Sequence, residues 1–169
     1  MHIREFQLGD EAGLHAVFFS AIHELASKDY TPEQIEAWAP ASLDPEIWVK
    51  RMRGIRPFVA VEPHGRLVAY ADVQPTGYID HFFVSGPFAR AGIGTMLMNR
   101  IYEAASAQDI SVLTSDVSRT AQPFFTQFGF VVVEQRAPVI RGVTVPNALM
   151  RCEVTANPSF KRTCLRQAA

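Results

Sequence analysis

Two glycines, Gly92 and Gly94, stand where an apolar stretch ends and a run of apolar residues at helical spacing begins. Glycine has no Cβ, so the backbone can approach a ligand closely, and the first N–H groups of the following helix have no partner inside that helix. Those N–H groups and the positive end of the helix dipole attract a phosphate or another anion. The stretch 84–98 is therefore an anion-binding turn or an ordinary strand-to-helix turn, and the glycines alone do not separate the two.

The spacing of these glycines excludes two common phosphate motifs. A dinucleotide fingerprint G-x-G-x-x-G needs a third glycine where Leu97 stands, and a P-loop needs Gly-Lys-Ser/Thr, which this stretch lacks. An anion bound here needs a different kind of turn.

Helical patterns precede the strands that lead to this turn. Apolar residues recur at helical spacing over 14–25, and a third helical segment is predicted over 44–53. Between them, Thr31 and Gln34 have the spacing of a capping box, with Pro32 at the first helical position. We therefore expect three helices in the first third of the chain.

Three apolar runs separated by Gly and Pro turns follow, at 58–61, 67–73 and 78–84. They predict successive antiparallel strands, the last of which leads into the glycine turn. The spacing after the turn predicts a helix over 93–106 and then a strand over 110–114. The strand before the turn, this helix and the strand after it make a right-handed βαβ unit with a parallel strand pair.

The last third of the chain is predicted to contain one more helix and two more strands. Ser118 is the expected cap of a helix over 119–127 that Gly129 ends. Two final strands are predicted at 130–134 and 139–153.

Composition indicates one globular domain, with 169 residues of which 48% are hydrophobic. A formal charge of −1 gives no reason to expect nucleic acid or an anionic membrane as a partner. Residues 1–50 hold nine acidic and three basic side chains, so the basic excess lies in the part that would hold an anion. Two cysteines without metal-ligand spacing, and no apolar run long enough for a membrane helix, predict a cytoplasmic protein without a metal.

The order of these elements and two motifs resemble the GNAT superfamily of N-acetyltransferases. The turn 89–94, Ala-Arg-Ala-Gly-Ile-Gly, is similar to the family's Q/R-x-x-G-x-G/A, and the stretch 118–130 is similar to its N-x-x-A-x-x-F-Y-x-x-x-G-F. The resemblance covers about residues 1–153, and the segments 78–80, 141–143 and 147–150 are similar to a YafP-like bacterial subgroup.

The resemblance implies an α+β, three-layer fold. The family's sheet is mixed and mostly antiparallel, with about six to seven strands, a splayed parallel pair at its centre and helices on both faces. We expect one acetyl-CoA-binding domain over 1–156, followed by a loosely ordered basic tail over 157–169.

The resemblance also implies acetyl-CoA as the cosubstrate. Its pyrophosphate would lie on the N–H groups of the glycine turn, and its pantetheine arm would pair with the strand before the turn. A backbone N–H near Phe83 or Val84 would polarise the thioester carbonyl. The cofactor-binding residues implied are Phe82, Phe83, Val84, Ala89, Arg90, Ala91, Gly92, Ile93, Gly94, Thr95, Ser118, Arg119, Phe124 and Phe125.

The sequence departs from the family pattern at three positions. Ala89 stands where Gln or Arg is usual, so a cationic contact to phosphate would come from Arg90 or Arg119, and Ser118 replaces the usual Asn. Phe125 stands where many relatives have a tyrosine that protonates the leaving thiolate, and a phenyl ring has no proton to donate. Two alternatives follow: an N-acetyltransferase that protonates the thiolate by another route, or a non-catalytic acyl-CoA-binding regulatory module.

Acetyl transfer needs a neutral amine, so a nearby group would accept the amine's proton. Asp80, in the strand that leads to the turn, is the first candidate, and Glu24 and Tyr78 are the alternatives. His23 and His81 adjoin apolar residues, and we expect both to be structural.

Three aromatic residues, Tyr30, Trp38 and Trp48, are either core anchors or in part the wall of an acceptor pocket. If they line a pocket, Tyr30 and Trp38 are the ones expected to contact the acceptor, and the acidic excess of residues 1–50 would favour a cationic amine. The sequence thus predicts direct attack of a small-molecule or peptide amine on acetyl-CoA without an acyl-enzyme. A homodimer is one possible assembly.

Overall fold

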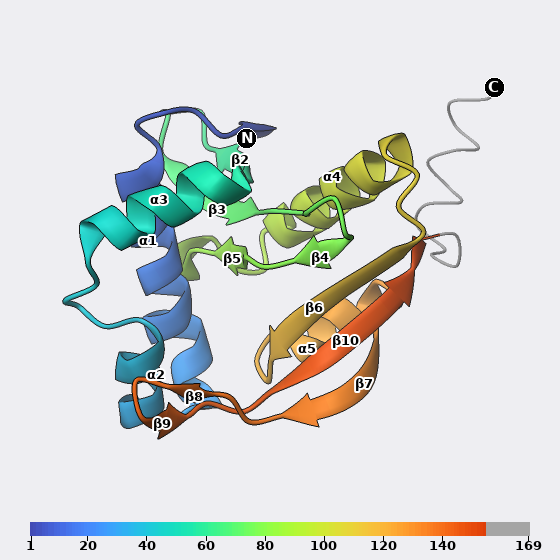
Figure 1. Ribbon diagram of the computed structural model, residues 1–169. Coiled ribbons are helices and arrows are strands. Elements are labelled where there is room, and N and C mark those ends of the chain that lie inside the picture. The colour runs from blue at the N-terminus through green and yellow to red at the C-terminus, as the bar shows by residue number, and fades with distance from the viewer. Residues whose placement is uncertain (155–169) are drawn as a thin grey trace.

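A computed structural model describes residues 1–154, and two four-stranded sheets form its centre (Figure 1). The first sheet has the strand order β1-β2-β3-β5 and the second β4-β6-β10-β7. In the first sheet the strands are β1 (His2–Glu5), β2 (Phe58–Val61), β3 (Leu67–Ala71) and β5 (Phe82–Val84). In the second they are β4 (Tyr78–Ile79), β6 (Val112–Ser118), β10 (Asn147–Glu153) and β7 (Val131–Arg136).

The strand expected over 78–84 is divided between the two sheets. Its first part, β4, pairs in parallel with β6, and its second part, β5, pairs antiparallel with β3. Asp80 and His81 lie between the two parts, so the sheets diverge at these residues. The mixed α+β fold and the parallel pair are confirmed, but the strand before the turn is interrupted rather than continuous.

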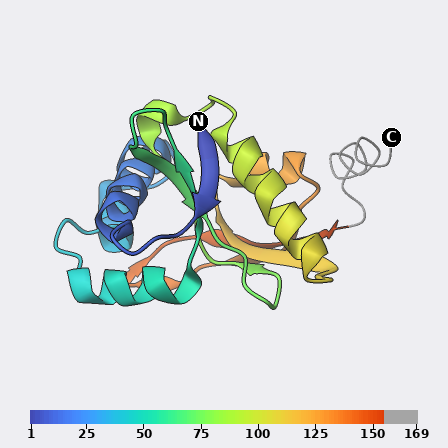
Figure 2. The same cartoon turned by 90° about the horizontal axis from the view of Figure 1, so that it is seen from above.

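Helices cover both faces of the first sheet (Figure 2). The helices α1 (Glu11–Ser20) and α3 (Pro45–Ile55) lie on one side and α4 (Ile93–Ala107) on the other. The helix predicted over 93–106 is therefore confirmed, and its apolar face is buried against the sheet at Ile93, Leu97, Ile101 and Ala105.

The first predicted helix changes its geometry before it ends. After α1 the chain forms a π-helical turn over Ala21–Leu25 and a short 3₁₀ segment over Ala26–Lys28. The capping box that begins α2 (Pro32–Trp38) is confirmed, because Thr31 Oγ1 accepts from Gln34 N at 3.2 Å and Gln34 Oε1 accepts from Thr31 N at 3.0 Å.

Two predictions for the last third are corrected. The helix expected from 119 is α5 (Gln122–Gln127), and Ser118 belongs to β6 and does not cap it. The strand expected over 139–153 is interrupted by a small hairpin, β8 (Val139–Ile140) and β9 (Val143–Thr144). Its two turn residues, Arg141 and Gly142, both have positive φ, 48° and 81°, as a two-residue hairpin turn requires.

The expected tail over 157–169 lies outside the described residues. Within residues 1–154, the helices are too short or too polar to cross a membrane.

Candidate active site

The glycine turn places two residues in the left-handed region just before α4. Arg90 has φ 62° and Gly92 has φ 80°, and the first helical bond runs from Met96 N to Gly92 O at 3.1 Å. The N–H groups of residues 93–95 therefore precede the first helical bond and point out of the helix start. Residues 90–92 are exposed, so the turn is open to an anion from solvent.

Gly94 lies against the second motif. A Cβ at this position would lie 3.1 Å from two ring atoms of Phe124, and the Phe124 ring in turn packs 5.3 Å from the ring of Phe82. The turn, the strand before it and α5 therefore meet at one place.

Phe125 lies below this contact, in the core. Its side chain is 2% exposed and its ring packs 5.4 Å from Phe82 and 5.0 Å from Phe130. In this structure Phe125 packs the interior and has no surface that would contact a ligand, whereas Phe82, Phe83, Val84 and Phe124 are half-buried.

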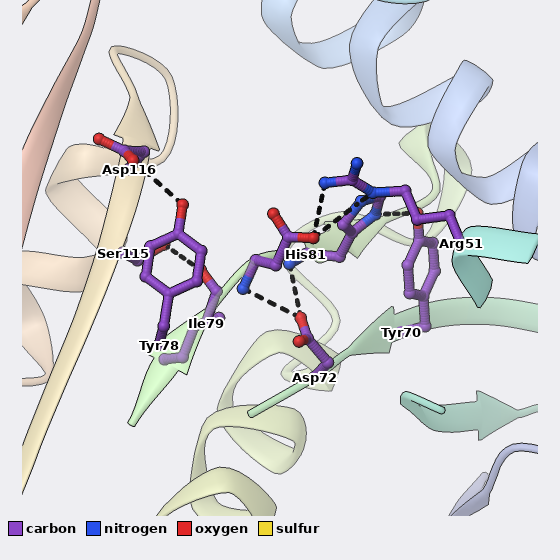
Figure 3. A network of polar contacts seen from close by, with 9 residues as sticks. Arg51, Tyr70, Asp72, Tyr78, Ile79, His81, Ser115 and Asp116 are labelled. Atoms are coloured by element: carbon purple, nitrogen blue, oxygen red, sulfur yellow. Dashed lines mark hydrogen bonds and ion pairs between the residues drawn. The ribbon is translucent and has the colours of Figure 1, made fainter. Parts of the chain in front are cut away.

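Asp72 lies beside the division between β4 and β5 (Figure 3). Its Oδ1 accepts from Asp80 N at 3.1 Å and from His81 N at 2.6 Å, and its own N–H donates to His81 O at 3.1 Å, so the side chain satisfies the two N–H groups between β4 and β5. Asp72 is 1% exposed, and Oδ2 has no hydrogen-bond partner among residues 1–154. Burial raises the pKa of this carboxyl to about 6.

His81 is a neutral structural residue, as expected. Arg51 Nε donates to His81 Nε2 at 2.9 Å, so the ring proton is on Nδ1, which lies 2.9 Å from the Tyr70 hydroxyl. Burial lowers the pKa of His81 to about 4, which keeps the imidazole uncharged at neutral pH.

Asp80 lines a cavity and is oriented by Arg51. Arg51 Nη2 donates to Asp80 Oδ2 at 2.6 Å, and the Asp80 side chain is 18% exposed. Oδ1 makes no hydrogen bond within residues 1–154, so one carboxylate oxygen remains open to a proton donor.

Tyr78 lines the same cavity but has the wrong protonation state for a base. Its hydroxyl donates to Asp116 Oδ2 at 3.0 Å, and Arg136 Nη1 donates to Asp116 Oδ1 at 2.9 Å. Burial, followed by the hydrogen bond to Asp116, raises the pKa of Tyr78 to about 12. The phenol therefore stays protonated at neutral pH, and we do not retain Tyr78 as a base.

Glu24 is not one of the side chains that line the cavity. Its Oε1 accepts from Ser20 Oγ at 2.7 Å, and Ser20 Oγ accepts from Gly86 N at 2.9 Å. Its carboxylate fills the space over Gly86, at the start of the short 3₁₀ segment Gly86–Phe88 that follows β5. Glu24 therefore holds the end of β5 in place, and its position does not favour proton transfer in the cavity.

The cavity lies between the helices α1, α2 and α3 on one side and the stretch 78–84, β6 and the β8–β9 hairpin on the other. Its volume is about 380 Å³. It has the size of a small-molecule site. Its walls are Phe18, Tyr30, Trp38, Leu43, Ile47, Trp48, Arg51, Tyr78, Asp80, His81, Phe83, Asp116, Ser118, Ile140, Arg141, Val145, Pro146 and Asn147.

Tyr30 and Trp38 both lie in this wall. The Tyr30 hydroxyl donates to Pro146 O at 2.6 Å and accepts from Arg119 N at 2.8 Å, so only its ring is available to a ligand. Trp38 is half-buried, whereas Trp48 is 5% exposed with its Nε1 donating to Glu11 O at 2.7 Å. Trp48 is thus mainly a core residue.

The sequence did not single out Arg51, Asp72 or Asp116. Asp72 follows a buried apolar strand directly, which is a signal that its carboxylate has an internal partner. Arg51 and Asp116 carry no such signal, because their partners come from distant segments. Among residues 1–154, no group of three or more His, Cys, Asp or Glu could hold a metal ion.

Acetyltransferases are among the solved structures that this chain resembles. A GCN5-related N-acetyltransferase from Rhodopseudomonas palustris has a TM-score of 0.85 and 29% identity, covering 90% of this chain and 94% of that one. PaiA N-acetyltransferase from Thermoplasma acidophilum, in complex with coenzyme A, has a TM-score of 0.68 and 15% identity, covering 90% of this chain and 98% of that one. YncA from Salmonella typhimurium, with acetyl-CoA, has a TM-score of 0.66 and 17% identity, covering 91% and 94%.

The sequence comparisons identify the family. The model of the Acetyltransferase (GNAT) domain matches residues 26–145. The chain is also 33% identical over 158 residues to the uncharacterized N-acetyltransferase YafP of Escherichia coli K12, covering 89% of this chain and 95% of that protein. The chain belongs to the GNAT family of acetyl-CoA-dependent N-acetyltransferases.

Proposed function

We propose that this N-acetyltransferase transfers the acetyl group of acetyl-CoA directly to a primary amine of a small molecule or peptide held in the cavity beside Asp80. The observation that carries the proposal is that the stretch 78–84, which contains β4 and β5, connects the cavity with the glycine turn. It contributes Asp80 to the cavity wall, and it continues into the open glycine turn.

The cofactor would lie along β5 and the turn. β5 pairs with β3 along one edge and is the last strand of the first sheet, so its other edge has no strand partner among residues 1–154. The pantetheine amides would pair with that edge, and the pyrophosphate would bind the N–H groups of residues 93–95. Arg90, Arg119 and Ser118 are the side chains proposed to contact the cofactor beside the turn.

In the proposed reaction the amine nitrogen attacks the thioester carbon, the C–S bond breaks and CoA thiolate leaves. Asp80 Oδ1 accepts the amine proton directly or through one water. A backbone N–H of Phe83 or Val84 stabilises the oxyanion of the tetrahedral intermediate. Because Phe125 is buried and has no proton to donate, the thiolate takes its proton from solvent or from Asp80.

Gly92→Ala should raise the acetyl-CoA dissociation constant about tenfold, because an L-residue at φ 80° is strained by about 1–2 kcal/mol and relief of that strain moves the N–H groups of the turn. Isothermal titration measures this change. Gly65→Ala is the matched control, since Gly65 has φ 88° and, like Gly92, nothing within 4 Å of an added Cβ. Equal acetyl-CoA affinity in the two variants would remove the turn from the cofactor site.

The proposed function is tested by following thiol release from acetyl-CoA across primary amines and identifying the N-acetyl product by mass spectrometry. We expect release that depends on the amine and one product per thiol. Acetyl-CoA binding with no release above hydrolysis would favour the non-catalytic module. Covalent acetyl-protein formed before the amine is added would contradict direct transfer.

A further inference from the structure

The acceptor cavity does not share the acidic charge of the stretch that forms much of its wall. Residues 1–50 contribute six side chains, and all of them are aromatic or aliphatic: Phe18, Tyr30, Trp38, Leu43, Ile47 and Trp48. The acidic residues of this stretch lie elsewhere, for example Asp10 on Arg4 and Glu11 on Arg53. The acidic excess therefore gives no support to the expectation of a cationic acceptor.

The carboxylates that line the cavity are already paired. Asp80 is bonded to Arg51 at 2.6 Å, and Asp116 is bonded to Arg136 at 2.9 Å and to the Tyr78 hydroxyl. Arg141, from the β8–β9 turn, donates to Ala37 O at 2.6 Å. Both carboxylates of the wall are therefore paired with guanidinium groups, and Arg141 adds a positive charge, so the wall has no unpaired anion to attract a second ammonium group.

The remaining wall is aromatic. The ring of Trp38 lies 5.6 Å from the ring of Tyr30 and 6.4 Å from the ring of Phe83. Phe18 and Trp48 continue the cluster behind Phe83 and are buried, while Trp38 and Phe83 are half-buried. Rings with part of their surface exposed in a cavity gain by covering that surface with an apolar or aromatic body.

Resting on the proposed function, we infer that the acceptor is a primary amine on an aromatic or extended apolar body that carries no second ammonium group. The amine meets Asp80, and the body packs on Trp38 and Phe83. A second ammonium group would leave water for a cavity whose carboxylates are already paired, so its desolvation would not be compensated.

Two measurements on phenethylamine, spermidine and lysine test the inference. Binding to the CoA-loaded protein by isothermal titration does not depend on turnover, and kcat/KM by thiol release does. We expect phenethylamine to be favoured by about tenfold or more in both. Equal or tighter binding of spermidine or lysine would overturn the inference. Preferred binding of phenethylamine without thiol release would support it and contradict the proposed function instead.

A charge placed in the wall gives the sharper test. Ile47 is 63% exposed and lines the cavity, so Ile47→Glu adds an unpaired carboxylate at little cost to folding. We expect this variant to raise the spermidine-to-phenethylamine ratio of kcat/KM about fivefold or more. Val49→Glu adds the same charge on α3 outside the cavity and should leave the ratio unchanged. An unchanged ratio in Ile47→Glu, or equal changes in both variants, would contradict the inference.

Discussion

Replacing Asp80 by Asn should lower kcat for acetyl transfer about 10²–10³-fold at neutral pH, while the acetyl-CoA dissociation constant changes little. The amide keeps the shape of the side chain but cannot accept the amine's proton. Arg51 can still donate to the remaining carbonyl oxygen, so the orientation of the side chain should persist. Initial rates of thiol release at saturating acetyl-CoA measure the effect.

Asp116→Asn is the matched control for this prediction. Asp116 is the other carboxylate in the cavity wall, but both its oxygens are occupied, by Tyr78 and Arg136. We expect its kcat to stay within about threefold of the unmodified protein. Full activity in Asp80→Asn, or an equal loss in both variants, would remove Asp80 as the base.

Replacing Asp72 by Ala should lower kcat about tenfold or more, because the N–H groups of Asp80 and His81 lose their acceptor and the division between β4 and β5 relaxes. Asp72→Asn retains a side-chain oxygen for those N–H groups and should keep most of the activity. Tyr102→Phe, which removes the buried hydrogen bond from Tyr102 on α4 to Phe128 O, is the control for a loss of stability alone. If Asp72→Ala lost no more activity than Tyr102→Phe, Asp72 would not position the site.

The pH dependence of stability tests the same carboxyl. The pKa of Asp72 is about 6 in the folded protein and would be about 4 in the unfolded chain, so folding is favoured by protonation. This contribution is fully present below pH 4 and is lost as the pH rises through 6, about 1 kcal/mol of it between pH 5 and 7.5. The titratable residues that interact with Asp72 are Asp80, His81, Tyr70 and Tyr78.

The Asp72→Asn variant should not lose this stability as the pH rises, because an amide does not ionise. The free energy of unfolding should be measured with urea at pH 5 and pH 7.5 for both proteins. We expect the value of the variant minus that of the unmodified protein to increase as the pH rises. Parallel changes in the two proteins would show that the Asp72 carboxyl does not titrate in this range.

Structural features that depend on residues close together in the chain were predicted correctly. The capping box at Thr31, the glycine turn and the buried stripe of α4 depend on residues close in the chain, and all three are present. The start of α5 was misplaced although Pro123, in its first turn, was a usable signal. The hairpin at Arg141-Gly142 also had a signal, a two-residue glycine turn between β-branched pairs.

The interrupted strand had no local signal of that kind. The stretch 78–84 was predicted as one strand, and the contacts at its interruption come from Asp72, just after β3, and from Arg51 on α3. The cavity likewise depends on tertiary placement, since it joins Trp38, Asp80 and Arg141 from three distant segments. The sequence therefore predicted the glycine turn and singled out Asp80, but it did not reveal the groups that orient Asp80.

The most direct test of the central claim, that the turn before α4 holds acetyl-CoA, is thermal unfolding with and without acetyl-CoA, for the unmodified protein and Gly92→Ala. Acetyl-CoA at about 100 times its dissociation constant should add about 2.7 kcal/mol to the free energy of unfolding. The same concentration should stabilise Gly92→Ala clearly less. No shift in the unmodified protein at millimolar acetyl-CoA, or an equal shift in the variant, would contradict the claim.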